Sequence, residues 1–169
     1  VIACSHSGNT EETLYALKDA QAADCEIACI TSGGELKEIA DKNNYNNIII
    51  PDGRSPRAML PYSIVSLIYT LERYGLISEE VINELKMAIQ SVTELDSECE
   101  KIGAEIAENI FGKKVMLYAD SQFEGVTIRF RQQLNENAKI LCSHHIYPEM
   151  NHNELVGWAG GNNEAVITF

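Results

Sequence analysis

Short apolar runs alternate with helical stripes over the first fifty residues. The runs occupy residues 1–4, 27–30 and 48–50. Between them, apolar residues recur at the spacing of one helix face: Leu14, Leu17 and Ala20 or Gln21 in the first segment, and Leu36, Ile39 and Ala40 in the second. Strand, helix, strand, helix and strand in this order predict a parallel sheet covered by helices on both faces.

Capping residues indicate where two of the helices begin. Ser32 and Glu35 have the spacing of a capping box, so the second helix should begin there. Ser55 and Pro56 should open another helix, with the serine as N-cap and the proline at the first helical position.

The helix expected over residues 58–71 is apolar nearly all round, which suggests either a membrane span or a buried helix. The run is shorter than the roughly 20 apolar residues that cross a bilayer. It also contains Pro61 and the polar residues Ser63, Ser66 and Thr70. We therefore expect a buried helix and no membrane segment.

The second half of the chain begins with a purely helical pattern and then returns to an α/β pattern. Residues 78–114 are densely charged, with apolar positions at helical spacing, and predict two helices. Further elements are expected as strands at 115–118, 140–142 and from 166, and as helices after Gly125 and over 151–158. The first of these helices should bury the face formed by Val126, Phe130 and Leu134.

The chain is therefore expected to be an α/β protein in three parts. An α/β unit over residues 1–76 is followed by a helical connector over 77–113 and a second α/β unit over 114–169. Both ends of the chain fall inside apolar runs typical of strands. We expect both units to be incomplete and the chain to be an internal fragment of a longer protein.

Charge and cysteine content exclude some classes of function. The net charge of −12 argues against non-specific binding of nucleic acid, which needs a basic face. One bound anion stays compatible with this charge, because helix N-termini are locally positive. The five cysteines are an odd number without a C-x-x-C motif, which suits reduced thiols in a cytoplasmic protein better than a disulfide framework.

A hydroxyl-rich segment follows the first expected strand, and it reads Ser5-His6-Ser7-Gly8-Asn9-Thr10. Ligands of doubly wound sheets bind at this end of a strand. Its hydroxyls can donate to phosphate oxygens, Gly8 lets the backbone come close, and the helix start adds N–H groups. An ordinary helix start explains the pattern equally well, so both interpretations stay open. The segment is not a nucleotide-binding P-loop, because no lysine is placed for one.

Two charged residues stand where the helix dipole disfavours them. Arg57 is expected in the first turn of a helix, which an anion bound nearby would explain, although a solvated surface arginine is the alternative. Glu136 is expected in the last turn of a helix, where the dipole favours its neutral form and makes it a plausible general base. The alternative is a solvated glutamate paired with Lys139.

The histidines and cysteines do not form a metal-binding pattern. His144 and His145 are adjacent on an expected strand and point to opposite faces, so they cannot both bind one metal ion. His152 lies further on, without a cysteine or acid at ligand spacing. We reject a metal site and interpret Cys4 as a core residue.

Five segments resemble the bifunctional phosphoglucose/phosphomannose isomerases, a branch of the sugar isomerase (SIS) domain proteins. They are Ser5-His6-Ser7-Gly8-Asn9-Thr10-Glu11-Glu12-Thr13, Thr31-Ser32-Gly33-Gly34, Pro56-Arg57-Ala58 with Leu60-Pro61, Asn135-Glu136-Asn137-Ala138-Lys139, and Pro148-Glu149 with His152-Asn153. The first two are generic to SIS domains, and the last three, in this order, are specific. The resemblance runs over the whole chain.

The resemblance implies a fold and an activity. The family has two SIS domains of flavodoxin-like topology, usually as a homodimer, with no metal or other cofactor. Its members interconvert glucose 6-phosphate or mannose 6-phosphate with fructose 6-phosphate through a cis-enediolate, in glycolysis and gluconeogenesis. The implied partner of this chain is therefore a hexose 6-phosphate, with no nucleic acid and no membrane.

The resemblance also implies roles for residues of this chain. Ser5, Ser7 and Thr10, in the loop with Gly8 and Asn9, would hold the sugar phosphate. Glu136 would move the proton between C1 and C2, and His152 would open the sugar ring from the partner subunit. Arg57 would stabilise the negative enediolate, an electrostatic role that often contributes most to catalysis.

Two other classes of function stay open beside the isomerase. A sugar-phosphate-sensing SIS module would keep the hydroxyl-rich loop but would not need Arg57, Glu136 and His152. The other is an isomerase or amidotransferase that acts on an amino-sugar phosphate, which binding of glucosamine 6-phosphate without binding of mannose 6-phosphate would favour. The family also uses a lysine and a specificity region beyond residue 169, so we expect the 169 residues alone to be inactive.

Overall fold

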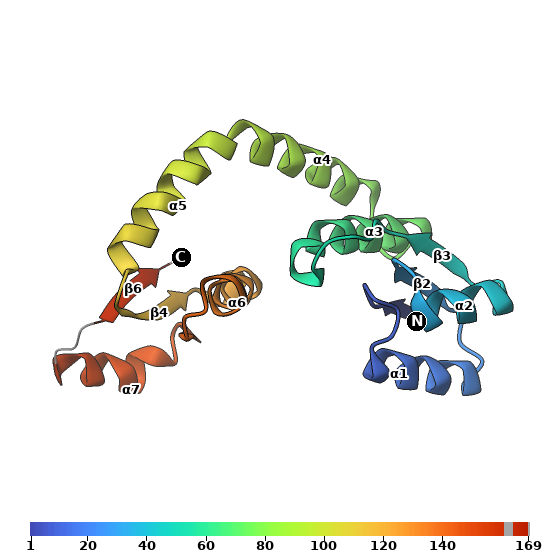
Figure 1. Ribbon diagram of the computed structural model, residues 1–169, viewed down its shortest axis with the longest axis horizontal. Coiled ribbons are helices and arrows are strands. Elements are labelled where there is room, and N and C mark those ends of the chain that lie inside the picture. The colour runs from blue at the N-terminus through green and yellow to red at the C-terminus, as the bar shows by residue number, and fades with distance from the viewer. Residues whose placement is uncertain (161–163, 169) are drawn as a thin grey trace. The chain divides into compact units, whose positions relative to one another are not determined.

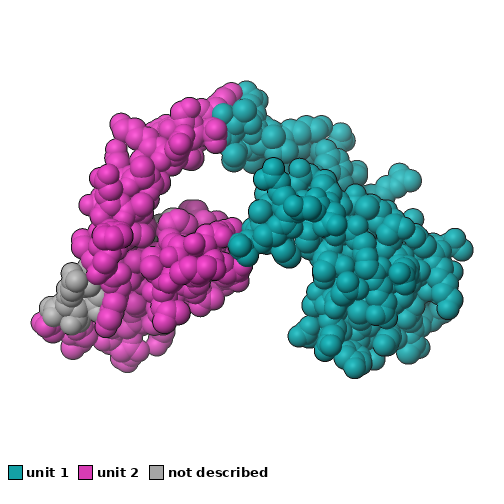
Figure 2. Space-filling view, viewed as in Figure 1, with its two compact units in different colours: residues 1–93 teal, residues 94–169 magenta. Residues whose placement is uncertain are grey.

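The computed structural model describes residues 1–160 and 164–168, and for Glu164 it describes the backbone alone. The chain forms two compact units, Val1–Thr93 and Glu94–Phe169 (Figure 2). Each unit is a parallel sheet with helices, so the predicted α/β class is confirmed.

The first unit is built on a sheet of three parallel strands in the order β1-β2-β3. Its elements are β1 (Ile2–Cys4), α1 (Glu11–Ala22), β2 (Ala28–Thr31), α2 (Gly34–Asn43), β3 (Asn46–Ile49), the 3-10 turn η1 (Pro56–Ala58), α3 (Leu60–Arg73) and α4 (Glu79–Glu94). The strands and helices predicted over the first fifty residues are thus confirmed.

The core of the first unit lies between the sheet and helices α1 and α2. Leu14, Leu17 and Ala20 of α1 pack there with Leu36 and Ala40 of α2, as the helical stripes predicted. Helix α3 lies on the other side of the sheet from α1 (Figure 1). Both faces therefore carry helices, although the four residues of β3 stay exposed at the edge of the sheet.

The predicted capping box of Ser32 and Glu35 is wrong, whereas Ser55 and Pro56 do hold the N-cap and first positions, but of a three-residue 3-10 turn and not of a long helix. Helix α2 begins at Gly34, and the Ser32 hydroxyl donates to the backbone oxygen of His6 (2.6 Å) and does not cap the helix. Pro56 opens only the three-residue turn η1, and the buried Ser55 hydroxyl has no partner among the described residues. At α2, a contact from outside the helix replaces the local cap. At Ser55, the tight turn itself replaces it.

The prediction that residues 58–71 form a buried helix is also wrong. Of the fourteen residues of α3, all of them described, only Thr70 is buried. Large apolar side chains on this helix are exposed: Tyr62, Ile64, Leu67 and Tyr69. The reason is that the sheet covers only one side of α3. No helix among the described residues is long and apolar enough to cross a membrane.

The second unit has a sheet of three parallel strands in the order β5-β4-β6. Its elements are α5 (Asp96–Ile110), β4 (Lys114–Ala119), η2 (Ser121–Phe123), α6 (Glu124–Gln133), the π-turn η3 (Leu134–Ala138), β5 (Cys142–Ile146), α7 (Met150–Gly157), η4 (Trp158–Gly160) and β6 (Glu164–Thr168). Helices α4 and α5 confirm the two helices predicted within residues 78–114.

The strand orders fit the flavodoxin-like topology that the resemblance implied. A flavodoxin-like sheet has the order 2-1-3-4-5. The order β5-β4-β6 repeats its 2-1-3 part, and three sequential neighbours in the first sheet repeat its 3-4-5 part. The division of the chain at residues 76 and 113 stays a prediction.

Three residues do not lie where their sequence pattern placed them. Val126 is 57% exposed, and Thr127 is buried on α6 in its place, beside the half-buried Phe130 and Leu134. The strand expected at 140–142 starts later, at Cys142, and Leu141 is 92% exposed. Cys4 is exposed and not a core residue, while Cys29 and Cys142 are the buried thiols. Alternation between the two sheet faces explains the exposure of Cys4, which lies on β1, whereas Val126 lies on a helix and Leu141 precedes β5.

Candidate active site

The hydroxyl-rich segment forms a tight loop at the carboxyl end of β1. The hydroxyls of Ser5 and Thr10 are 2.8 Å apart and hydrogen-bonded, and Ser5 Oγ also accepts from the N–H of Gly8 (3.1 Å). Ser7 Oγ accepts from the N–H of Asn9 (3.2 Å). Ser5 is buried, whereas Ser7 and Thr10 are exposed at the surface of the loop.

A second segment, residues 31–36, is held against this loop by hydrogen bonds of backbone and side-chain groups. The N–H and hydroxyl of Ser32 both donate to His6 O, at 3.0 and 2.6 Å. The N–H of Leu36 donates to Gly8 O (2.9 Å), and the N–H of Glu35 donates to Asn9 Oδ1 (3.0 Å). Asn9 therefore caps α2 from the neighbouring loop, which is the contact that replaces the expected capping box.

Two glycines allow this close packing of the two loops. Gly8 has a φ of +70°, and a Cβ atom on it would lie 1.8 Å from the backbone oxygen of Gly33. Gly34 has a φ of +66°, and a Cβ atom on it would lie 2.3 Å from the backbone oxygen of Ser7. Side chains cannot fit at either place, so the sequence Gly33-Gly34 of the SIS-like segment supports the shape of the loop that precedes α1.

The loop has the chemical groups that bind an anion. It presents the exposed hydroxyls of Ser7 and Thr10 at the start of α1, whose first N–H groups have no partner inside the helix. Thr10 occupies the N-cap position and its hydroxyl bonds to Ser5 and not to the helix. Glu11 and Glu12 already complement the helix dipole. An anion here would therefore depend on the hydroxyls and loop N–H groups more than on the dipole.

Arg57 lies at the same edge of the first sheet as this loop. It belongs to η1, which follows the carboxyl end of β3, and the loop follows the carboxyl end of β1. Its side chain is exposed. The prediction that Arg57 sits in the first turn of a long helix is wrong, because α3 begins only at Leu60. The dipole argument for an anion beside it therefore does not apply.

Glu136 lies in a π-turn that extends α6. Turn η3 continues the helix with the wider spacing of π-helices, which occur often at functional sites. Asn135 Oδ1 accepts from the N–H of Cys142 (2.9 Å), and Lys139 ends the turn in a left-handed conformation. Lys139 Nζ donates to the backbone oxygen of Glu136 (2.6 Å). These contacts fix the backbone around Glu136 and leave its carboxylate at the exposed surface.

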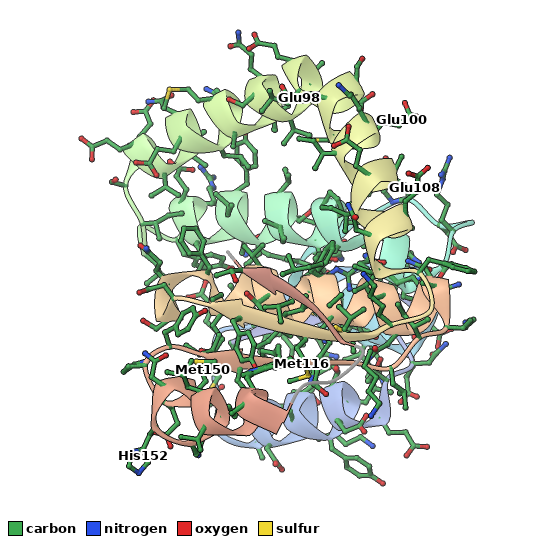
Figure 3. All side chains as sticks on the ribbon, turned by 90° about the vertical axis from the view of Figure 1, so that its left-hand side faces the viewer. Glu98, Glu100, Glu108, Met116, Met150 and His152 are labelled. Atoms are coloured by element: carbon green, nitrogen blue, oxygen red, sulfur yellow. The ribbon has the colours of Figure 1, made fainter. Side chains whose placement is uncertain are left out.

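His152 lies on α7, near the helix start. The N–H of His152 donates to Glu149 O, and the N–H of Asn151 donates to Pro148 O, both at 3.0 Å. The peptide bond between Tyr147 and Pro148 is cis. The imidazole is exposed and points away from the sheet of its unit (Figure 3).

Glu136 and His152 lie beyond opposite ends of β5. The π-turn precedes β5 at Cys142, and α7 follows β5 after Ile146. A strand of five residues is roughly 13 Å long at the usual rise per residue. The structure therefore separates these two residues within one chain, while it brings Ser5, Ser7, Gly8, Asn9 and Thr10 together in one loop.

A polar network near the carboxyl ends of β4 and β5 was not expected from the sequence. Glu154 Oε2 accepts from the hydroxyl of Tyr118 (2.8 Å), and Glu154 Oε1 forms an ion pair with His145 Nδ1. Trp158 Nε1 donates to the same tyrosine hydroxyl (3.0 Å). Four separate elements contribute these residues, so helical or strand spacing alone gives no signal for the network.

Burial and hydrogen bonds shift the titration of this network. Burial raises the pKa of Tyr118, and its hydrogen bond to Glu154 raises it further. Burial would raise the pKa of Glu154, but the hydrogen bonds from His145 and Tyr118 outweigh it and lower the pKa. At neutral pH the network thus holds a carboxylate and a protonated phenol. Among the described residues, no three His, Cys, Asp or Glu side chains group as metal ligands.

Comparisons with known proteins agree on the family. Residues 100–169 match the family model of the bacterial phospho-glucose isomerase C-terminal SIS domain. A bifunctional phosphoglucose/phosphomannose isomerase of Caldicellulosiruptor bescii is 36% identical over 165 residues, which are 93% of this chain and 48% of that protein. A D-glucosamine-6-phosphate 4-epimerase of Sulfolobus acidocaldarius is 39% identical over 156 residues, with 92% and 49% of the two chains covered.

A solved structure supports the same fold. A protein from Clostridium difficile 630, provisionally assigned as a phosphosugar isomerase, matches with a TM-score of 0.70 at 20% identity, over 99% of this chain and 50% of that chain. The chain thus spans about half the length of the curated relatives that it matches. Together with the loop and the two parallel sheets, these matches make the chain similar to the bifunctional phosphoglucose/phosphomannose isomerases and, over residues 100–169, to the C-terminal SIS domain of bacterial phospho-glucose isomerase.

Proposed function

We propose that this chain takes part in the isomerisation of glucose 6-phosphate or mannose 6-phosphate to fructose 6-phosphate. The observation that carries the proposal is the loop from Ser5 to Thr10, with its hydroxyls gathered at the carboxyl end of β1. The names of the similar bifunctional isomerases support the substrate class. The proposed setting is central carbohydrate metabolism in the cytoplasm.

The phosphate of the sugar would bind to the loop before α1. Ser7 and Thr10 are exposed and can donate, while the buried Ser5 supports the loop through Thr10 and Gly8. Arg57 lies at the same edge of the sheet and would stabilise the negative charge of the enediolate.

Glu136 would act as the base of the reaction. It would take the proton from C2 of the open-chain aldose, so that the electrons of that C–H bond form the C1=C2 bond of a cis-enediolate with the negative charge on O1. The protonated carboxyl group would return its proton to C1 while the hydroxyl proton on O2 passes to O1, which gives the ketose. A carboxylate can transfer the proton from C2 to C1 when it lies within hydrogen-bond reach of both carbons. The π-turn supports this role, because Lys139 bonds to the backbone oxygen of Glu136 and the neighbouring Asn135 bonds to the N–H of Cys142, which together hold the backbone at Glu136.

His152 would open the sugar ring and would come from the partner subunit of a homodimer. The separation of Glu136 and His152 by the length of β5 supports a shared site, since one chain does not bring them together. The units 1–76, 77–113 and 114–169 would then be the end of one SIS domain, a connector and the beginning of another.

Removal of the base tests the proposal. We expect Glu136→Gln in the full-length protein to lower kcat by about 10³-fold or more, while the affinity for inorganic phosphate stays unchanged. Full activity of this variant would overturn the assignment of Glu136. Phosphate-sugar binding without turnover by the unaltered protein would instead support the regulatory SIS module.

Complementation tests the shared site. Glu136→Gln and His152→Ala should each retain only a small residual activity alone, yet refolding the two together should restore up to about a quarter of the normal activity, because half of the dimers are mixed and each has one intact site. A mixture as inactive as its components would contradict the sharing of His152 between subunits.

A second candidate substrate class is an amino-sugar phosphate. The specific observation is that the similar 4-epimerase of glucosamine 6-phosphate is 39% identical to this chain. The loop before α1 would serve the same phosphate in both cases. Turnover of glucosamine 6-phosphate, measured beside glucose 6-phosphate and mannose 6-phosphate, distinguishes the two candidates.

A further inference from the structure

Helix α7 has few apolar contacts with the rest of its unit. Of its eight residues, Met150–Gly157, all of which are described, only Met150 is buried. Leu155 is 60% exposed and Val156 is 75% exposed. A helix this short has little stability of its own, so its position depends on the contacts that hold it.

The network around Glu154 supplies the missing contacts. Its carboxylate reaches β4 through Tyr118 and β5 through His145. Tyr118 is 2% exposed, so its hydroxyl needs a partner inside the unit, and it has two, Glu154 and Trp158. The sheet and the two segments 150–157 and 158–160 are therefore joined at one buried hydroxyl.

The spacing along α7 puts this attachment opposite His152. Met150 and Glu154 are four residues apart and share one face of the helix, and His152 lies between them on the other face. Figure 3 shows Met150 pointing toward the sheet and His152 pointing away from it. Two anchors one turn apart fix both the tilt and the rotation of a helix, whereas one anchor leaves its rotation free.

We propose that Glu154, held by Tyr118 and His145, is a positioning residue that sets the direction in which α7 presents His152. This inference rests on the proposed role of His152. Glu154 lies on the face turned to the sheet, so it acts through the helix and does not touch the substrate. Ion pairing to His145 and hydrogen bonding to Tyr118 give it two separate attachments, which define its geometry better than either alone.

A double-mutant cycle in the full-length protein tests the proposal. Glu154→Ala should lower kcat/KM by about 10- to 100-fold, as small displacements of a catalytic group do. Glu154→Gln should recover most of that loss, because its amide can still accept from Tyr118 and donate to His145. Val156→Ala, on the exposed side of the same helix, is the matched control and should behave as the unaltered protein.

The decisive measurement repeats Glu154→Ala in a His152→Ala background. If Glu154 acts through His152, it should have no further effect there, since the group it positions is gone. The dissociation constant for inorganic phosphate should be the same in all variants. An equal loss in both backgrounds, or a weaker affinity for phosphate, would overturn the inference.

Three outcomes separate this inference from the proposed function. If His152→Ala alone leaves kcat/KM unchanged, the role of His152 fails and the inference fails with it. If His152→Ala is impaired while Glu154→Ala is fully active, only the inference fails. If Glu154→Ala does not fold, Tyr118→Phe takes its place in the same cycle, because it removes the hydroxyl that Glu154 and Trp158 share.

Discussion

The two units hold their candidate site residues in different ways. In the first unit, two loops bond to each other mainly through backbone groups, with added bonds from the side chains of Ser32 and Asn9, and glycine is required where the loops touch. In the second unit, side chains do this work: Asn135 fixes the turn that contains Glu136, and Glu154 fixes the helix that contains His152. A loop shaped by backbone contacts tolerates few substitutions, whereas side-chain contacts can be removed one at a time.

The largest effect should come from the glycine contact of the first unit. Gly8→Ala would place a Cβ atom 1.8 Å from Gly33 O, at a φ of +70°. The left-handed backbone alone costs about 1–2 kcal/mol, and the clash adds to this by forcing the loops apart. We expect lost phosphate binding, measured by calorimetry, together with a lower midpoint of urea unfolding.

Gly103→Ala is the matched control for this substitution. Gly103 lies inside α5, and a Cβ atom there meets nothing within 4 Å. Alanine should raise the stability of this helix by about 0.5–1 kcal/mol. A Gly8→Ala protein that binds phosphate normally would show that the two loops do not constrain each other.

Two asparagines allow the units to be compared through the same chemistry. Asn135 Oδ1 accepts from the N–H of Cys142 in a partly buried place, and Asn9 Oδ1 accepts from the N–H of Glu35 at the surface. Asn135→Ala should cost about 1–3 kcal/mol because a buried N–H loses its partner. Asn9→Ala should cost about 1 kcal/mol or less, since water replaces the amide. Denaturant unfolding of both variants measures this, and a larger loss for Asn9 would reverse the comparison.

Acid should affect the second unit through Glu154 and should give the smallest effect. Its folded-state pKa is lowered, so its stabilising contribution is present above the ordinary carboxyl range and is lost as pH falls through the folded pKa. Trp158 is the only tryptophan of the chain, and it is bonded to Tyr118. Its fluorescence should therefore change below about pH 4.5, before circular dichroism reports general unfolding.

Glu154→Gln removes the carboxyl group and is the control for this titration. The acid-induced change of Trp158 fluorescence should be smaller in that variant. An identical change in both proteins would show that another group causes it.

Regular spacing accounts for the parts of the molecule that the sequence could predict. The stripes Leu14-Leu17-Ala20 and Leu36-Ala40 face the core as expected, because a covered helix must bury one face. The same rule failed on α3, where an apolar helix is covered on one side only. Periodicity reports which residues are apolar, and it does not report how much of the helix a neighbour covers.

The candidate site was predictable where its residues are contiguous. Ser5 to Thr10 needed only one strand end and one helix start to meet in a loop. The cap from Asn9 to α2 joins residues 26 positions apart, and the bond between Tyr118 and Glu154 joins residues 36 apart. Such contacts depend on tertiary packing, so no local pattern at Ser32 or on α7 could indicate them.

The hydrogen bonds between the loop before α1 and the start of α2 also have a kinetic consequence. The N–H groups of Ser32 and Leu36 donate to backbone oxygens of the first loop, so these two amides exchange with solvent only when the two loops separate. Such groups open together, as one cooperative unit, at a free energy above that of ordinary surface loops. The proposed anion site would then be pre-organised before any ligand arrives, and we expect bound phosphate to slow hydrogen exchange in the first turn of α2.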